Sequence, residues 1–342
     1  LNYLLTIKND KRLKYFYTPN RLSAIENCDL AVCKSDGYYA CLIGDDDGIT
    51  PEIINICYWL KKNSFDSMCC NVPLYTWTDM EHAISINNAY NGKLVIPKFT
   101  GDFEIINPNH ELIKLINSGA QNLFKIPRLY QGIVSKNILI ELKKIVGTYF
   151  PGPVPDMSNA VAISSLIQRH CFIDLPFIIA GHSKNSMSGK NSKRLHQGEI
   201  ISEKSLDKLT ANKWSKKIPF FWSAPTIWSE AAIKSLEKMK LYKELELFNY
   251  ANVYASCFSY CDSKYYKRIF NSINLEKNIF KLLFTYIKVL YYIIFSFIKR
   301  AWNLINKLIK GIKGIECNEI HIASSICSKM IKEIGTLNNF KI

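Results

Sequence analysis

The sequence lacks the cysteine spacing of a structural zinc site. Its 11 cysteines include no Cys-x-x-Cys pair. The nearest approaches are Cys257 with Cys261 and the adjacent Cys69 and Cys70, and neither has a second pair to complete four ligands. Internal repeats and low-complexity tracts are also missing, and the first residues do not have the charged-then-apolar order of a signal peptide. Reduced thiols in the cytoplasm are the simplest account of these cysteines.

Acidic residues are scarce beside basic ones. The 342 residues hold 29 Asp and Glu against 44 Lys and Arg, which gives a net charge of +15. This surplus favours an anionic partner, whether nucleic acid, a phospholipid surface or a phosphorylated small molecule. We expect no nucleic-acid partner, because the basic residues gather beside an apolar segment near the C-terminus and not in an aromatic and basic readout motif.

Three consecutive carboxylates end an apolar run early in the chain. Residues 38–44 predict a buried strand, and Asp45, Asp46 and Asp47 follow it directly. Adjacent like charges repel, so a fold keeps them together mainly where a cation lies among them. In open α/β sheets, ligands bind at the carboxyl ends of the strands. The triplet is therefore the candidate cation site.

A simpler interpretation of the triplet stays open. Short acidic runs after strands also form solvated turns or lead into helices, and Thr50-Pro51-Glu52 has the hydroxyl, proline and acid of a helix N-terminus. An EF-hand is excluded, because its acidic ligands alternate with other residues and end at a distant bidentate glutamate.

The segments around the triplet alternate between helix and strand. Ser23 and Glu26 have capping-box spacing, and Gly147 is placed to end a helix. Helices are predicted at 23–32, 51–62, 135–146 and 157–170, and strands at 172–176 and 177–180. This order predicts an α/β fold with a mostly parallel sheet flanked by helices.

A proline-rich loop precedes the helix at 157–170. Its prolines fix the backbone from Phe150 to Asp156, and Asp156 lies where the helix begins. Aspartate is also a frequent helix cap, so this position alone leaves its role open.

Four motifs follow one another along the chain. They are Ile43 to Gly48, Tyr149 to Asp156, Gly181-His182-Ser183, and Ile218-Pro219-Phe220-Phe221-Trp222-Ser223. Together with the helix and strand order, this set resembles the family 2 glycosyltransferases with a GT-A fold, and within them a bacterial subgroup linked to surface-polysaccharide synthesis. The resemblance covers roughly residues 1–189. It implies a GT-A-like, Rossmann-like sheet with a helical C-terminal extension.

The resemblance implies that the acidic motif binds a nucleotide diphosphate sugar through a divalent metal. Asp45 and Asp47 would be metal ligands, and Asp45 and Asp46 would contact the donor. Hard oxygen ligands suit Mn²⁺ or Mg²⁺, which would neutralise charge on the departing nucleoside diphosphate.

The same resemblance implies two further residues of the donor site, which follow the strand predicted at 177–180. His182 would reach the metal, and Lys184 would reach the phosphates from a mobile small-polar and basic loop at 183–194. A polar loop histidine and an ordinary solvated basic loop are the alternatives.

Asp156 is similar in position to the catalytic base of the family. Inversion at the sugar carbon needs a carboxylate that takes the proton of the acceptor hydroxyl. The acceptor would be a glycan or a lipid-linked glycan. The usual Glu-Asp pair is replaced here by Pro155-Asp156, a departure from the pattern of the family.

The chain opens at Leu1 and not at a methionine. Members of the family begin with a strand and loop that hold the nucleotide base. We therefore expect those residues to lie upstream of Leu1, in a longer protein.

The segment 278–313 combines a long apolar run with lysines at helical spacings. The run is slightly short for a membrane-spanning helix and is interrupted by Lys288. An amphipathic helix lying on an anionic membrane surface fits better, and a core helix is the alternative. We expect a cytoplasmic protein held peripherally on the inner face of the cell membrane.

These features predict three parts and two competing functions. The parts are a transferase domain at 1–190, a helical acceptor or accessory region at 191–270 and a basic membrane-associating tail at 271–342. A metal-dependent phosphohydrolase or nucleotidyltransferase would use the same acids. A non-catalytic membrane-surface protein derived from a transferase is the other alternative.

Overall fold

The computed structural model describes residues 10–207, 209–310 and 313–334. The α-helices are α2 Ala24–Lys34, α3 Ile53–Lys62, α4 Pro108–Asn117, α5 Lys136–Val146, α6 Pro155–Ser164, α7 Met187–Ser192, α8 Ala224–Lys238, α9 Tyr242–Glu246, α10 Tyr250–Tyr260, α11 Tyr266–Ile273, α12 Ile279–Lys310 and α13 Ile320–Ile334. Short 3₁₀ helices are η1 Ser85–Tyr90, η2 Ile200–Ser202, η3 Ala211–Lys213 and η4 Ser263–Tyr265. The strands are β1 Tyr39–Ala40, β2 Gly48–Ile49, β3 Ser67–Cys70, β4 Leu74–Thr76, β5 Lys93–Val95, β6 Phe103–Ile106, β7 Ile133–Ser135, β8 His170–Ile173, β9 Ile178–His182, β10 Gln197–Gly198, β11 Trp222–Ser223 and β12 Ile315–Glu316.

The strands form two five-stranded sheets and a two-stranded ribbon. The first sheet has the order β1-β7-β3-β8-β6, the second β12-β5-β4-β9-β2, and β10 pairs with β11. Among the described strands, only β3 with β8 and β4 with β9 run parallel. The α/β class is confirmed, but the expectation of a mostly parallel sheet is wrong. Short strands that fold back beside their neighbours, such as β5 on β4 and β6 on β8, make both sheets mixed.

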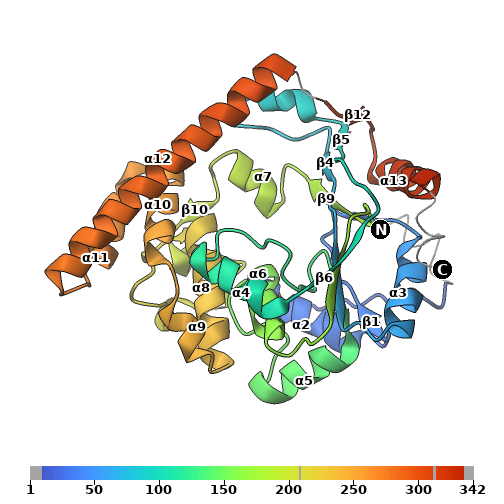
Figure 1. Ribbon diagram of the computed structural model, residues 1–342, viewed down its shortest axis with the longest axis horizontal. Coiled ribbons are helices and arrows are strands. Elements are labelled where there is room, and N and C mark those ends of the chain that lie inside the picture. The colour runs from blue at the N-terminus through green and yellow to red at the C-terminus, as the bar shows by residue number, and fades with distance from the viewer. Residues whose placement is uncertain (1–9, 208, 311–312, 335–342) are drawn as a thin grey trace.

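Helices cover both faces of the first sheet. On one face, Ile56 and Leu60 of α3 pack in a buried cluster with Met68 of β3. On the other, Leu139 and Leu142 of α5 pack with residues of α6 and β7. Figure 1 shows the sheets nearly edge-on, with α3 and α13 on one side and α4, α6 and α8 on the other. Burial on both faces explains why these strands are rich in apolar residues.

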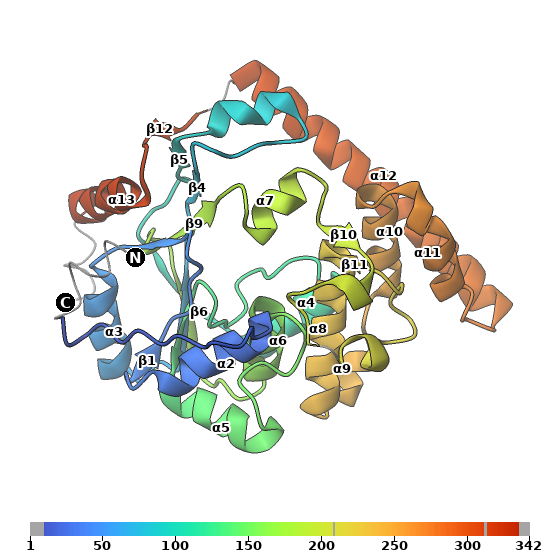
Figure 2. The same ribbon diagram turned by 180° about the vertical axis from the view of Figure 1, so that it is seen from behind.

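A second helical layer lies beyond α6. The largest buried cluster joins α4, α6, α8, α10 and α11, with Phe221 stacked on Tyr265 at 4.4 Å between ring centroids. Figure 2 shows α8 to α11 gathered on the side away from α3. The helix α6 is therefore shared by two cores, which fits the complete burial of residues 157–164.

The cap signals read from the sequence are confirmed. Ser23 and Glu26 form the capping box of α2. The Ser23 N–H donates to the Glu26 carboxylate at 2.7 Å, and the Glu26 N–H donates to the Ser23 hydroxyl at 3.3 Å. Gly147 ends α5 with a φ of 82°, a conformation in which its missing Cβ avoids strain.

Three predicted elements differ from the structure. The strand before the triplet is short: β1 covers Tyr39–Ala40, and Leu42 adds a single bridge to Tyr130. The helix predicted at 157–170 ends at Ser164. His170 belongs instead to β8, where its ring hydrogen-bonds to the Ser67 side chain on β3. The loop expected at 183–194 contains α7, capped by the side chain of Ser186.

The end of the described chain returns to the second sheet. Strand β12 pairs with β5, and α13 packs beside β2 and β9. Ile320 of α13 fills the space above Gly48, where a Cβ would lie 2.9 Å from its side chain. Ser324 and Ser328 donate hydrogen bonds of 2.6 Å to the carbonyl of Ile49 and to the carboxylate of Glu52. Residues 315–334 are thus part of the N-terminal structure.

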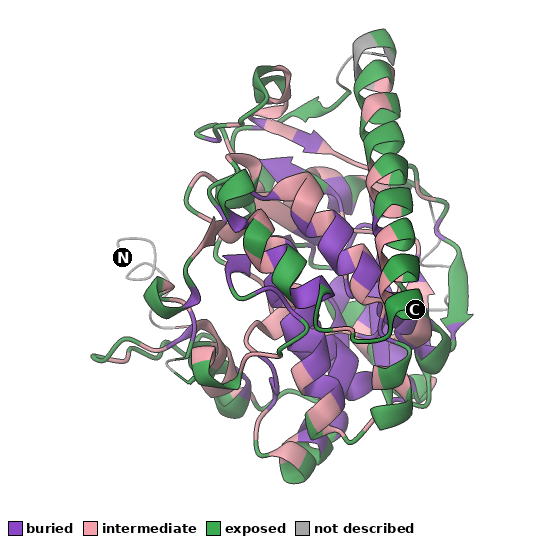
Figure 3. Cartoon of the chain, turned by 90° about the vertical axis from the view of Figure 1, so that its left-hand side faces the viewer, coloured by how far each residue is buried: buried purple, intermediate pink, exposed green. Residues whose placement is uncertain are grey.

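Between these parts, α12 crosses the outside of the molecule. One face packs on α10 and α11 through Leu282, Tyr286, Val289 and Ile293, and Val289 is the most buried of these. Figure 3 shows the remainder of the helix exposed along its length. Within the described residues, Ile279–Asn306 is the one helical stretch long and apolar enough to cross a membrane.

Candidate functional site

The acidic triplet forms a tight turn in which its three carboxylates have different surroundings. Asp45 is exposed, Asp46 is half-buried and Asp47 is 8% exposed. Among the described residues, Asp45 has no hydrogen-bond or ion-pair partner. The turn therefore presents one carboxylate to solvent and keeps another inside.

Asp47 is held by donors from three segments. Its Oδ2 accepts hydrogen bonds from the Gly44 N–H at 2.8 Å and the Tyr130 hydroxyl at 3.1 Å. Its Oδ1 accepts from the Gly181 N–H at 2.8 Å, and the Gln131 amide reaches both oxygens at 3.1 and 3.2 Å. Hydrogen bonds to a charged acceptor are the stronger ones in proteins. Protein donors thus satisfy this carboxylate, and a metal would have to displace them.

Asp46 lies against β9 and the residues after it. Its carboxylate accepts from the Ser183 hydroxyl at 2.8 Å and the Ser183 N–H at 3.3 Å, while its carbonyl accepts from the Trp77 indole at 3.1 Å. A Cβ at Gly181 would lie 1.7 Å from the Asp46 carbonyl oxygen. Only glycine permits this approach, which fixes the turn on the end of β9.

Backbone pairing explains how Tyr130 and Gln131 reach the turn. The Leu42 N–H donates to the Leu129 carbonyl at 2.9 Å, and the Gln131 N–H donates to the Leu42 carbonyl at 2.9 Å. Gln131 has a φ of 54°, unusual for a residue with a side chain. This pairing continues the path of β1 and sets two donors beside Asp47.

Asp156 lies in the first turn of α6. The helix is capped by Val154, so the alternative of Asp156 as the N-cap residue is wrong. Its Oδ1 accepts from the Met157 N–H at 2.8 Å, and the indole of Trp228 lies beside the same carboxyl and favours its charged form. Burial raises the pKa of Asp156, and these hydrogen bonds offset part of that rise. A carboxylate with a raised pKa is a better proton acceptor.

Hydrogen bonds tie the loop before Asp156 to the segment beside the triplet. Asp29 of α2 accepts from the Thr148 hydroxyl at 2.8 Å and the Tyr149 N–H at 2.7 Å. Buried Asn159 of α6 donates to the Tyr149 carbonyl at 3.0 Å and accepts from the Leu129 N–H at 3.2 Å. The helix that carries Asp156 is therefore joined to the residue next to Tyr130.

Tyr130 lies within electrostatic reach of both acidic groups. Burial raises the pKa of its phenol well above the usual range, and the charges of Asp47, Asp46 and Asp156 raise it further. Tyr130 accordingly stays a neutral hydrogen-bond donor. The structure bonds Tyr130 to the triplet and places Asp156 within its electrostatic range.

His182 and Lys184 make contacts elsewhere. His182 is at the end of β9, and its Nε2 lies 3.1 Å from the Ser188 carbonyl oxygen. Lys184 pairs with Glu81, which also binds Lys193 at 2.5 Å. Both predicted residues thus hold the segment around α7 in place, and a role toward the diphosphate requires them to leave these partners.

The residues present fit a metal that is shared with a substrate. Within the described part of the chain, no group of three or more His, Cys, Asp or Glu side chains is placed to hold a metal. Mg²⁺ commonly takes one or two carboxylates and completes its shell with phosphate oxygens and water. Exposed Asp45 and the free oxygen of Asp46 suit that chemistry. Metal binding by the three residues predicted from the sequence, Asp45, Asp47 and His182, remains a prediction.

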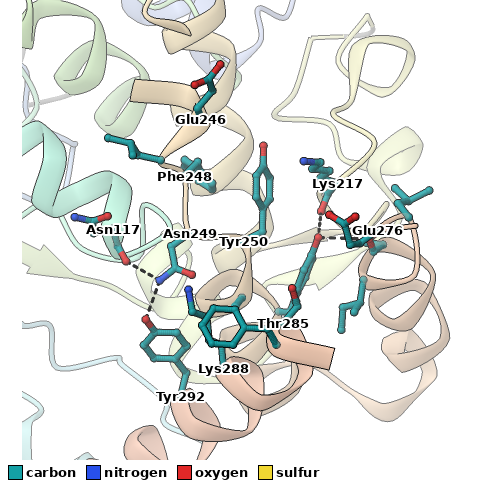
Figure 4. A pocket seen from close by; sticks show the side chains of 17 residues that line it. Asn117, Lys217, Glu246, Phe248, Asn249, Tyr250, Glu276, Thr285, Lys288 and Tyr292 are labelled. Carbon is teal, nitrogen blue, oxygen red and sulfur yellow. Dashed lines mark hydrogen bonds between the residues drawn. The ribbon is translucent and has the colours of Figure 1, made fainter. Parts of the chain in front are cut away.

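A cavity of about 510 Å³ lies away from these residues, between α10, α11 and α12. Figure 4 shows Asn249 at its wall, bonded to the Asn117 carbonyl and the Tyr292 hydroxyl, with Lys288 nearby. None of the residues that form its described wall is a predicted site residue. The size of a cavity therefore does not mark the acidic site in this fold.

Sequence reasoning missed several contributors to the site. Tyr130, Gln131 and Asn159 stand outside any motif, and only the pairing of distant segments gives them their role. Ser183 follows His182 in a quoted motif, and Trp228 is an isolated tryptophan in a helical segment, so both offered a visible signal.

No family model matches the chain, and no curated protein is significantly similar to it. The geometry of the site is therefore the basis on which a function can be proposed.

Proposed function

We propose that this protein is an inverting, metal-dependent glycosyltransferase of GT-A-like architecture. It would move a sugar from a nucleotide diphosphate sugar to a glycan or lipid-linked acceptor. The observation that carries the proposal is the chain of contacts between two separate acidic groups: Tyr130 bonds to Asp47 of the triplet, and its neighbour Leu129 bonds to Asn159 of the helix that bears Asp156. Sugar transfer needs oxygen ligands near the departing diphosphate and a different carboxylate for the acceptor hydroxyl.

On the donor side, the three aspartates divide the work. Asp45 and Asp46 present the oxygens that hold a divalent cation together with the diphosphate, which compensates the charge of the leaving group. Asp47 braces the turn through its bonds to Tyr130 and Gly181. A rigid turn keeps the first two carboxylates in position without reorganisation during the reaction.

On the acceptor side, Asp156 is the general base. As the acceptor oxygen bonds to the sugar carbon and the bond from that carbon to the diphosphate breaks, the hydroxyl proton passes to Asp156. Its raised pKa supports this role, and the indole of Trp228 orients the carboxyl. Attack from the face opposite the leaving group inverts the sugar carbon.

The exposed face of α12 supports attachment to a membrane. Phe280, Ile287, Tyr291 and Phe297 are each more than half exposed, an unusual run of apolar side chains for a protein surface. Lys281 and Lys288 lie seven residues apart, near two helical turns, and so line one flank of the helix. Because the opposite face packs on α10, the helix would lie in the interface of an anionic leaflet and would not be surrounded by lipid.

A screen of nucleotide sugars with Mn²⁺ or Mg²⁺ tests the proposal. We expect release of a nucleoside diphosphate that depends on metal and acceptor, and loss of transfer in Asp156→Asn. Asp102→Asn is the matched control, because Asp102 is an exposed carboxylate on a different loop. Transfer unchanged in Asp156→Asn would contradict the assigned base.

The products also separate the other functions. Release of inorganic phosphate or pyrophosphate would favour a phosphohydrolase or nucleotidyltransferase that uses the same triplet. Vesicle binding without turnover of any nucleotide sugar, unaffected by substitution of Asp45, would favour a non-catalytic membrane-surface protein.

A further inference from the structure

Another cavity, lined by several charged side chains, lies behind the loop that carries Asp156. It has a volume of about 220 Å³ and opens between α8, the 3₁₀ helix η3 and the proline-rich loop at 150–153. Its ionisable lining residues are Asp207, Lys213, Glu230, Lys234 and Lys238. Three lysines facing two carboxylates give the cavity a positive balance.

The lysines converge because of helical spacing. Glu230, Lys234 and Lys238 are four residues apart on α8 and therefore share one face of the helix. Lys213 approaches from η3. Burial lowers the pKa of Lys238, and the charges of Lys213 and Lys234 lower it further. Within the described residues, Lys213 and Lys238 have no ion-pair partner, whereas Lys234 pairs with Glu237 at 3.0 Å and Glu230 at 3.7 Å. Two ammonium groups are thus free to bind an anion.

The cavity is joined mechanically to Asp156. A Cβ at Gly152 would lie 2.6 Å from the Ala231 carbonyl oxygen, so the loop rests directly on α8. Trp228, which favours the charged form of the Asp156 carboxyl, lies two residues before Glu230 on the same helix. A ligand held by the lysines would therefore lie against the elements that position Asp156.

We propose that this cavity binds a phosphate-class anion and, where the transferase proposal holds, that the anion is a phosphate group of the acceptor. Lysine ammonium groups bind phosphate as compact charges with several donors. The hydroxyl of Thr210 in the same wall offers a further donor. An acceptor anchored here would reach Asp156 across the proline-rich loop.

Glu230 gives the binding a pH dependence. It is 1% exposed, and the Ser215 N–H donates to its two oxygens at 3.0 and 3.2 Å. Burial raises its pKa to about 7, against the opposing charge of Lys234. Protonation removes a negative charge beside the anion and leaves Lys234 with Glu237 as its remaining partner, so binding strengthens as the pH falls through neutrality. The charged or titratable groups around it are Lys234, Glu237 and Lys238 of α8, Asp207 and Lys213 of the facing segment, and Tyr250 of α10.

Calorimetric titration with sulfate tests the site without needing a known substrate. The charge of sulfate is constant from about pH 6 to about pH 8, so any pH dependence belongs to the protein. We expect saturable binding that weakens at least about tenfold in the double variant Lys213→Gln with Lys238→Gln. Lys243→Gln with Lys267→Gln, two exposed lysines outside the cavity, is the control.

Glu230→Gln provides a second measurement that does not depend on losing a lysine. This variant should bind sulfate at about pH 8 as tightly as the unmodified protein does at about pH 6. Absence of saturable binding to the unmodified protein, or equal binding by the lysine double variant, would overturn the site.

Acceptor kinetics distinguish the source of the anion. If the acceptor carries it, sulfate competes with the acceptor, and the lysine double variant raises the KM for the acceptor and not for the donor. Sulfate binding without such competition assigns the cavity to a free anion and overturns the acceptor role alone. If no transfer is found at all, the titration still decides whether the cavity binds anions.

Discussion

The acidic turn and α12 are the two most unusual stretches of this sequence, and the fold treats them in opposite ways. Three adjacent carboxylates would repel one another in isolation, yet the fold surrounds Asp47 with donors and leaves only Asp45 fully exposed. The apolar run of α12 would suit a core, yet most of its large side chains face solvent. One anomaly is largely satisfied inside the protein and the other is not.

This difference shows what an odd composition can indicate. A cluster of like charges can be structural when enough N–H and O–H donors converge on it. An exposed apolar face has no such internal solution and requires an external partner. On the proposed function, each stretch acts through the part that the fold leaves unsatisfied: Asp45 with one oxygen of Asp46, and the outer face of α12.

The largest expected effect is on α12. Replacing Phe280, Leu290 and Phe297 by serine removes three exposed apolar side chains, each worth about 1.5 kcal/mol or more in a lipid interface. Binding to anionic vesicles should fall by about a thousandfold, measured by vesicle sedimentation. The matched control replaces Tyr58, Ile201 and Tyr242, which are equally exposed on other elements. Equal loss in both variants would remove the special role of α12.

The next largest effect is expected on turnover, through Asp156, which the fold keeps separate from the triplet. Asp156→Asn should lower turnover by about 10² to 10⁴, the usual range for loss of a general base, and should leave donor affinity unchanged. Single-turnover rates and equilibrium binding of the nucleotide sugar measure the two quantities. Donor affinity falling in parallel with turnover would move Asp156 to the donor side.

Within the triplet, stability and function should separate. Asp47→Asn weakens bonds to the half-buried Gly44 and Gly181 N–H groups and should lower the free energy of unfolding by about 2 to 4 kcal/mol. Asp45→Asn should change stability by less than about 0.5 kcal/mol and abolish metal-dependent donor binding. Urea unfolding and a binding titration measure the pair, and the reverse pattern would return Asp47 to the metal.

The smallest effect is a pH dependence outside the triplet. The pKa of Glu230 rises from 4.5 to about 7 on folding, so its contribution favours the fold at low pH and is lost as the pH rises toward 7. Glu230→Gln has no ionisable group at this position, so this loss of stability with rising pH disappears. It should stabilise the protein by about 1 to 3 kcal/mol at about pH 8 and change little at about pH 5. Chemical unfolding at both pH values checks the sign.

Local rules predicted much of the fold. The capping box at Ser23, the C-cap at Gly147 and the long helix at 279–310 depend on neighbours in sequence, and the structure has them close to where they were expected. The strand directions were not predictable in this way. They depend on which segments pair, and β6 returns antiparallel to β8, a strand that the pattern placed in a parallel sheet.

The site shows the same limit. The triplet and Asp156 could be selected from their sequence context alone. The different burial of Asp45 and Asp47 could not, because it arises from Tyr130, Gln131 and Gly181, far away in the chain. A motif thus identifies the chemistry available, and the tertiary contacts decide which of its residues are left to perform it.

The return of the chain end to the second sheet has a consequence for biosynthesis. Strand β12 covers β5, and α13 covers β2, which follows the acidic turn directly. Residues 315–334 are made after α12, so the sheet beside the turn keeps an open edge until translation of this segment is complete. On the proposed attachment of α12 to a bilayer, this helix is therefore synthesised before the acidic turn gains its final support. This order of events would place the nascent protein on the membrane surface first, and the acidic turn would be completed there.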